Sequence, residues 1–244
     1  MKRRLHFHYR RTKQQIYLTD RPFKMTKLCV PIQAKNIKEL KQQAKIALKK
    51  EADLIEIWLD QLNSLDGLES FIQKSEKPVV AVCKSKKEKG KFKGGSKEKC
   101  KILRLSADMG ASYVDISLDS PSRFIKKMPK SKTIISFHDF AGTPAYRKLE
   151  KIYQKARKFN PLIVKIATFI KNADDAGKLL QILQKGINDK QKMIVIGMGN
   201  KGKLARIACA KMGGFMTFVS LTDKSKTAPG QFTIEEYKKV DSIL

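Results

Sequence analysis

Lys165 is the residue of this sequence whose surroundings most strongly suggest chemistry. It lies in the apolar segment LIVKIATF (162–169), which has the β-branched composition of a buried strand. A buried ammonium group is unfavourable unless a carboxylate pairs with it or its pKa falls well below the ordinary value of about 10.4. The segment therefore allows two interpretations: a structural ion pair with Glu56, or a nucleophilic amine that forms an imine with a carbonyl substrate.

His138, in IISFHDFAGTP (134–144), is the only histidine of the sequence outside residues 1–24. A lone histidine is usually structural. At the end of a strand and beside an imine-forming lysine, however, an imidazole that titrates near pH 6.5 is suited to remove a proton next to a carbonyl. Alternation along the segment places His138 on the same face as Ser136. The sequence therefore predicts a lysine and a histidine that act on one carbonyl compound.

A glycine pattern near the C-terminus indicates a different chemistry. Gly197, Gly199 and Gly202 have the Gly-x-Gly-x-x-Gly spacing of a dinucleotide-binding turn, and Asp223 follows about 20 residues later. Only one further strand follows the motif, which is too little for a dinucleotide-binding half. We therefore do not expect a nucleotide cofactor.

The elements that must position these residues alternate regularly along the chain. Short apolar runs are each followed by a longer amphipathic segment, the pattern of parallel strands joined by crossover helices. Eight such units without a break predict an α/β fold of one domain, a (β/α)8 TIM barrel over residues 25–244. The expected strands are 28–32, 53–58, 79–83, 113–118, 133–137, 162–167, 193–197 and 215–220.

Polar residues that end apolar strands are the first candidates for a site, because barrel active sites lie at the C-terminal ends of the strands. Alternation puts Leu54, Glu56 and Trp58 on one face, which we expect to be the barrel interior, and does the same for Lys165. Asp115 also faces inward from its strand, and the sequence leaves open whether it takes part in catalysis.

Helix starts carry their own signals. Asn36 with Glu39, and Thr233 with Glu236, have the spacing of a capping box. Thr143 precedes Pro144, which predicts a helix beginning at that proline.

The net charge of +29 raises the possibility of a polyanionic partner. Residues 1–24 hold eight Lys/Arg and one Asp, so 44 basic and 22 acidic residues remain in the rest of the chain. This excess is spread over all the expected elements, without an arginine-rich stripe. We therefore expect nonspecific adhesion to polyanions but no specific nucleic-acid binding.

Residues 1–24 have neither a helical nor a strand period. They are interpreted as a basic extension that is disordered or that precedes the true start at Met25; an organelle presequence fits their composition less well. The four cysteines are scattered without a Cys-x-x-Cys pair, and no apolar run has the length of a membrane span. We expect a cytoplasmic protein that does not bind membranes.

The segments EIWLD, SFHDFAGTP, VKIATF, GMGNKGKLAR and TAPGQ, in this order and spacing, resemble those of the type I 3-dehydroquinate dehydratases. The resemblance extends from about Lys27 to the C-terminus. It implies a lyase of the shikimate pathway that forms 3-dehydroshikimate from 3-dehydroquinate with no metal or cofactor. It also implies a homodimer, as in many relatives.

The resemblance assigns roles to particular residues. Lys165 matches the lysine that forms the imine with the C3 ketone, and His138 matches the group that removes a C2 proton and then assists the departure of the C1 hydroxyl. Glu88 matches a carboxylate that orients the histidine. The matching substrate-binding residues are Glu56, for hydroxyl groups, Arg206, for the carboxylate, Thr227 and Gln231, in a lid, and the apolar Met198 and Phe218.

Two positions depart from the family pattern. Trp58 stands where the family has an arginine, which predicts the loss of a substrate contact. Lys84 stands where another arginine is usual and lacks the two-pronged geometry of a guanidinium, so weaker substrate binding is expected. The segment 84–99 carries eight lysines, which either form a solvated flexible loop or supply a positive field that lowers the pKa of Lys165. A weakened or repurposed barrel that binds a related ligand is therefore the main alternative.

Overall fold

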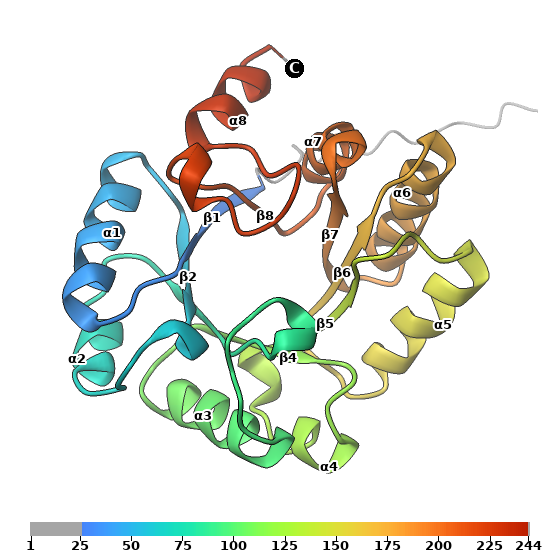
Figure 1. The fold of residues 1–244 in the computed structure, drawn as a ribbon. Helices are drawn as coiled ribbons and strands as arrows, with labels where there is room; N and C mark the ends of the chain where they lie inside the picture. The colour runs from blue at the N-terminus through green and yellow to red at the C-terminus, as the bar shows by residue number, and fades with distance from the viewer. Residues whose placement is uncertain (1–25, 244) are drawn as a thin grey trace, which may run out of the picture.

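The computed structural model describes residues 26–243. Eight parallel strands form one sheet in the order β7-β6-β5-β4-β3-β2-β1-β8, and eight α-helices surround it (Figure 1). This arrangement confirms the single (β/α)8 barrel. Residues 1–24, interpreted above as an extension, lie outside the described part of the chain.

The observed strands agree with the expected ones to within two residues at each end. They are β1 Lys27–Ile32, β2 Leu54–Trp58, β3 Val79–Val82, β4 Tyr113–Ser117, β5 Thr133–Asp139, β6 Ile163–Phe169, β7 Lys192–Met198 and β8 Met216–Phe218.

The helices differ more in length than the strands do. Their bounds are α1 Ile37–Lys49, α2 Leu68–Gln73, α3 Ser96–Asp108, α4 Ser122–Ile125, α5 Tyr146–Arg157, α6 Ala173–Asn188, α7 Lys203–Lys211 and α8 Ile234–Asp241. The α4 helix is a single turn, because Pro121 precedes it and Pro129 follows soon after.

The barrel is nearly closed. Backbone pairing runs from β7 through β6 and onward to β1 and β8, and no ladder joins β7 to β8 among the described strands. One hydrogen bond spans this seam, from the Phe215 amide to the Met193 carbonyl at 2.7 Å. The seam lies next to α7 and the segment that precedes α8, both of which contribute to the site.

Two apolar cores follow from the alternation along the strands. Residues such as Ile55, Val164 and Ile166 pack outward against the helices. Residues such as Leu54, Ile163 and Ile194 fill the barrel interior. This confirms that the face of β2 that carries Glu56 and the face of β6 that carries Lys165 point into the barrel.

The expected helix caps were only partly correct. The Asn36 side chain accepts a hydrogen bond from the Glu39 amide at 2.9 Å, and Thr233 with Glu236 forms a complete capping box. The start predicted at Pro144 is wrong, because α5 begins at Tyr146. Thr143 instead hydrogen-bonds the hydroxyl of Thr168 at 2.7 Å and the Phe169 carbonyl at 2.9 Å, which ties the end of β5 to the end of β6.

The glycines of the dinucleotide-like pattern serve the packing of the seventh barrel unit. A Cβ added at Gly202 would lie 2.6 Å from the Gly197 carbonyl carbon, so the turn after β7 can fold back only without a side chain there. Gly199 has a φ of 85°, and its amide donates to the Pro229 carbonyl at 2.9 Å. The pattern thus holds the segment 227–231 against the turn between β7 and α7.

Among residues 26–243, no helix is long and apolar enough to cross a membrane.

Candidate active site

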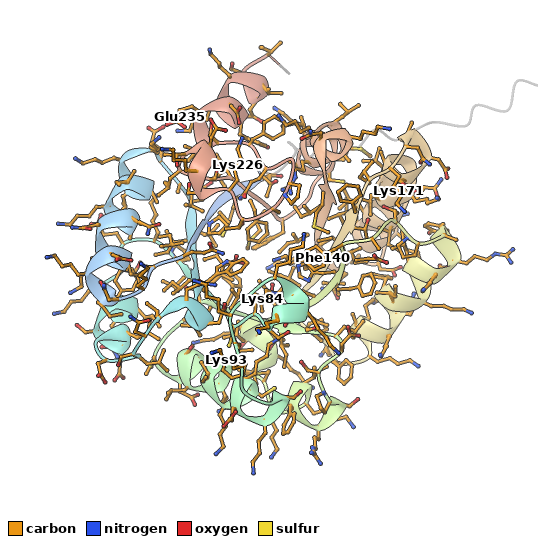
Figure 2. All side chains as sticks on the ribbon, in the orientation of Figure 1. Lys84, Lys93, Phe140, Lys171, Lys226 and Glu235 are labelled. Carbon is orange, nitrogen blue, oxygen red and sulfur yellow. The ribbon has the colours of Figure 1, made fainter. Side chains whose placement is uncertain are left out.

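The pocket lies at the C-terminal ends of the strands, as expected for a barrel. Its lining combines charged side chains with apolar ones. In Figure 2, Lys84 and Phe140, which both line it, lie near the centre of the ring of helices, whereas Lys171 and Glu235 lie farther out.

Lys165 points into the pocket from the middle of β6 and is buried. Its Nζ donates a hydrogen bond to Asp115 Oδ2 at 3.0 Å and lies 3.7 Å from Glu56 Oε2. The Nζ atom also lies 4.1 Å from the centroid of the Phe218 ring. Its main partner is therefore Asp115 on β4, and Glu56, the partner suggested by the sequence, is the more distant carboxylate.

These contacts decide the protonation of Lys165. Burial by itself favours the neutral amine, but the attraction of Asp115 and then of Glu56 outweighs it, so the pKa of Lys165 is raised above 10.5. The expected lowering by the surrounding lysines was wrong, because the attraction of Asp115 and Glu56 dominates at Lys165. The unliganded pocket thus holds Lys165 as an ammonium ion.

Asp115 is the centre of this network. One of its oxygens accepts from Lys165, and the other accepts from the Ser136 hydroxyl at 2.5 Å and lies 3.5 Å from Lys84 Nζ. Burial disfavours its charge, but the two lysines together with His138 and Ser136 lower the pKa of Asp115 below its ordinary range. Asp115 is therefore a carboxylate that stabilises positive charge at Lys165 Nζ.

His138 ends β5, next to the lysine strand. The register pairs Ser136 with Lys165 and His138 with Ala167, so the imidazole lies beyond the amine on the neighbouring strand, and both side chains line the pocket. Burial, followed by repulsion from Lys84 and Lys165, lowers the pKa of His138 well below 6.5, and Asp115 offsets this only in part. His138 is therefore a neutral imidazole that is able to accept a proton.

The segment after β3 is structured, and two of its lysines are turned inward. Lys84 is buried between Asp115 and Glu88, whose Oε1 lies 3.8 Å from its Nζ. Lys99, from α3, is also buried and hydrogen-bonds Glu88. The sequence suggested either a solvated flexible loop or a positive field around the substrate. Neither interpretation holds for Lys84 and Lys99, because carboxylates already compensate their charges.

Glu88 lies in the pocket wall with His138 and makes its described hydrogen bonds to Ser85 and Lys99. Burial opposes its charge, but Lys84 and Lys99 outweigh burial and lower the pKa of Glu88. Its Oε1 has no hydrogen-bond partner among residues 26–243. The predicted orientation of the histidine by Glu88 stays a prediction.

Trp58 and Glu56 form a unit at the end of β2. The indole Nε1 of Trp58 donates to Glu56 Oε1 at 2.9 Å, and both side chains are buried. Glu56 Oε2 accepts no hydrogen bond within the described chain and lies in the pocket near Lys165. The tryptophan thus fixes one carboxylate oxygen and leaves the other available to a bound molecule.

Arg206, near the start of α7, is a buried charge of the site with no carboxylate partner among the described residues. It is 2% exposed, and neither its Nε nor its Nη2 has a hydrogen-bond partner in the part of the chain described here. Burial lowers the pKa of Arg206 to about 10, which still leaves it charged at neutral pH. A buried guanidinium with free donors in a pocket wall is suited to bind a carboxylate.

The expected lid residues lie beside the pocket. Thr227 lines it, and the side-chain oxygen of Gln231 accepts hydrogen bonds from the Thr227 amide at 2.7 Å and hydroxyl at 3.2 Å. Gln231 is buried behind Thr227 and is not part of the pocket lining, but its amide nitrogen has no partner among the described groups. Met198 and Phe218 line the apolar side of the pocket, as expected.

The formal charges of the site leave a positive surplus. Three carboxylates face five cations, and with a neutral His138 the sum is +2; the groups are Glu56, Glu88 and Asp115 against Lys84, Lys89, Lys99, Lys165 and Arg206. The surplus belongs to Arg206 and Lys89, because Lys84, Lys99 and Lys165 each have a carboxylate partner. The pocket is therefore complementary to an anionic compound.

Sequence reasoning missed three contributors to the site. Asp115 was noticed but given no role, although an acidic residue at an inward position of a strand is itself a signal. Lys89 and Phe140 line the pocket and were not singled out. No group of three or more His, Cys, Asp or Glu side chains is arranged to hold a metal within residues 26–243.

Comparisons with known proteins agree with this geometry. The model of a family described as type I 3-dehydroquinase matches residues 28–244. A bifunctional 3-dehydroquinate dehydratase/shikimate dehydrogenase of Arabidopsis thaliana is 34% identical, over 86% of this chain and 36% of that protein. A 3-dehydroquinate dehydratase of Coxiella burnetii is 31% identical, over 84% of this chain and 88% of that protein. The chain therefore spans only a minor part of the Arabidopsis protein but most of the Coxiella one.

A solved structure of a type I 3-dehydroquinate dehydratase from Clostridium difficile, with covalently modified comenic acid, has the same fold. It superimposes with a TM-score of 0.80 at 22% identity and covers 90% of this chain and 92% of that one. At this identity the similarity supports the barrel architecture alone.

Proposed function

The chain belongs to the type I 3-dehydroquinase family, and on that premise we propose how its pocket removes water from 3-dehydroquinate. Membership makes the chain a hydro-lyase of the shikimate pathway that forms 3-dehydroshikimate and water. One observation carries the residue assignments. Lys165 Nζ lies 3.0 Å from Asp115 Oδ2 in a pocket that it shares with His138.

In the first step Lys165 becomes a nucleophile. Its ammonium group transfers a proton to the neutral His138, and the free amine attacks the C3 ketone. The resulting carbinolamine loses its hydroxyl as water by taking the proton back from His138, which leaves a protonated imine. Deprotonation is uphill in the unliganded pocket, whereas the imine restores positive charge at Nζ beside Asp115 and Glu56.

The second step is the elimination itself. His138 removes a proton from C2, and the electron pair moves into the imine to give an enamine. The C1 hydroxyl then leaves as water with the proton that His138 holds, and the double bond forms between C1 and C2. Hydrolysis of the conjugated imine releases 3-dehydroshikimate and regenerates Lys165.

The remaining groups bind the substrate. Arg206 offers two free donors to the single carboxylate of 3-dehydroquinate, which neutralises the buried guanidinium. Glu56 Oε2 accepts from a substrate hydroxyl while Trp58 holds its other oxygen. Thr227 offers its hydroxyl from the pocket wall, and Met198 and Phe218 contact the apolar face of the ring.

A conversion assay tests the proposal. The purified protein is incubated with 3-dehydroquinate, and formation of the conjugated product is followed by its ultraviolet absorption. We expect turnover by the wild type and a loss of about 10³-fold or more in kcat for Lys165→Met, because no other nucleophile replaces the amine. Undiminished turnover by this variant would show that the reaction does not pass through an imine on Lys165.

Two further properties belong to the proposal. Homodimer formation stays a prediction, and sedimentation velocity would measure it. A cytoplasmic location is supported by four cysteines that are all free and buried. Localisation of a tagged full-length chain would test it.

A further inference from the structure

Lys89 has a backbone conformation that its side chain does not favour. It follows the short helix η2 (Lys86–Glu88) with φ 64° and ψ 22°, in the left-handed region that glycine adopts without strain. Such outliers persist where the surrounding structure holds them, and they gather at functional sites. The position would be more stable as glycine, so the presence of a lysine needs another explanation.

The side chain of Lys89 lies at the pocket. It is among the lining residues, and its Nζ lies 4.6 Å from the centroid of the Phe140 ring. Phe140 in turn stacks on His138 with ring centroids 5.9 Å apart and an interplanar angle of 13°. The cation is thus held by an aromatic ring beside the imidazole, a contact that places the charge without neutralising it.

Lys89 differs from the other lysines of the site in being uncompensated. Lys84, Lys99 and Lys165 are buried and paired with carboxylates, whereas Lys89 is exposed and has no carboxylate partner among the described residues. The end of β2, the strand that pairs with β3, carries the uncharged indole of Trp58. Lys89 is therefore a free cation at the rim of a pocket that binds an anion.

We propose that Lys89 is a substrate-binding residue that captures the carboxylate of 3-dehydroquinate at the pocket mouth, before Arg206 receives it. The proposal rests on the function proposed above. Lys89 acts while the substrate enters, before the chemical steps, so its loss slows association, which raises KM and leaves kcat unchanged. The attraction acts between partly solvated charges and is weakened by salt.

The test uses variants of the full-length protein that separate charge from backbone strain. Lys89→Gly and Lys89→Asn both remove the charge and both tolerate the left-handed conformation, whereas Lys89→Arg keeps the charge. Lys190 offers a matched control: it is exposed, has φ 57°, follows α6 and lies at the start of β7, at the other end of the barrel.

We expect Lys89→Gly and Lys190→Gly both to raise Tm, because each removes the same strain. Only the Lys89 variants raise KM for 3-dehydroquinate, by roughly fivefold, with kcat within about twofold of the wild type. Their KM also depends less on ionic strength, and Lys89→Arg has a KM close to that of the wild type. An unchanged KM in Lys89→Gly and Lys89→Asn, with an active wild type, would overturn the role of Lys89 alone. Absence of turnover in the wild type would overturn the proposed function and this inference together.

Discussion

A lysine that attacks a ketone must lose a proton, yet the carboxylates around Lys165 oppose that loss. Asp115 at 3.0 Å and Glu56 at 3.7 Å favour the ammonium ion in the unliganded pocket. The same two carboxylates favour the protonated imine, which carries its charge on the same nitrogen. The two carboxylates thus lower the free energy of the imine intermediate. The neutral His138 accepts the proton of Lys165 and so makes the free amine accessible.

The pH dependence of kcat/KM follows from this pair. The reactive form holds one proton shared between Lys165 and His138. Because the pKa of His138 is lowered, the acidic limb should lie below pH 6.5; because the pKa of Lys165 is raised, the alkaline limb should lie above pH 10.5. A profile that falls already between pH 7 and 9 would be inconsistent with these assignments.

Replacing Asp115 should move the alkaline limb. Asp115→Asn removes the attraction that raises the pKa of Lys165, so this limb should shift to lower pH, while kcat should fall about tenfold or more because the imine loses a counter-charge. Ser136→Ala, which removes only a hydrogen bond to Asp115, is the control and should shift the limb less. A limb that stays in place in Asp115→Asn would show that this carboxylate does not set the pKa of Lys165.

The role of Trp58 in substrate binding can be tested by one replacement that removes its hydrogen-bond donor and another that retains a donor and adds a charge. Trp58→Phe keeps a ring in the barrel interior but loses the donor to Glu56 Oε1, and KM should rise roughly tenfold because a hydrogen bond to a buried carboxylate is lost. Trp58→Arg retains a donor and returns a cation to the pocket, so kcat/KM should rise. Steady-state kinetics with 3-dehydroquinate would check both, and no gain in the arginine variant would argue against an impaired site.

At the level of elements, the segment 227–231 depends on a close backbone approach. Gly230 has φ 73°, and a Cβ there would lie 2.1 Å from the Gly199 carbonyl oxygen. The turn after β7 and the residues around Thr227 are therefore fixed to one another without side chains. This contact sets the position of the part of the pocket wall that Thr227 lines.

Gly230→Ala should accordingly lower kcat/KM about tenfold or more, because the clash displaces Thr227 and Gln231. Gly67→Ala is a matched control, since φ is 78° there but the nearest atoms lie 3.7 Å away and belong to Ile37, outside the pocket. It should cost roughly 1 kcal/mol in stability and leave the kinetics unchanged. Thermal unfolding would measure the loss of stability of each variant, and the conversion assay would measure kcat/KM. An equal fall of kcat/KM in the two variants would contradict this role of the segment 227–231.

The strands and their inward faces could be predicted because alternation along each β-branched run is a local property. The positions of His138 and Lys165 on neighbouring strands followed from the barrel itself. The partners of Lys165 could not be predicted, because Asp115 is 50 residues away and their contact depends on strand register. The predicted sign of the pKa shift of Lys165 was wrong for the same reason. The predicted start of α5 was wrong because the Thr143 side chain hydrogen-bonds the Phe169 carbonyl at the end of β6.

For the whole molecule, the charge of +29 poses a question apart from catalysis. Within residues 26–243, only Lys84, Lys99 and Lys165 are buried lysines, and the other lysines there are at least partly exposed. Such a charge attracts polyanions without selecting among them.

We therefore expect weak binding to duplex DNA that falls steeply between about 50 and 200 mM salt and does not discriminate between sequences. Fluorescence anisotropy with two unrelated duplexes, for the full chain and for residues 25–244, would measure it. Sequence-selective binding at physiological salt that survives the deletion would indicate a nucleic-acid function instead.

The central claim is that Lys165 forms an imine with the substrate, and reduction by borohydride tests it most directly. The protein is incubated with 3-dehydroquinate and sodium borohydride, digested, and analysed by mass spectrometry, with a reaction lacking substrate as the control. We predict a stable adduct on Lys165, with loss of activity in proportion to labelling. Conversion of 3-dehydroquinate with Lys165 left unlabelled, or an adduct on another lysine, would contradict the account.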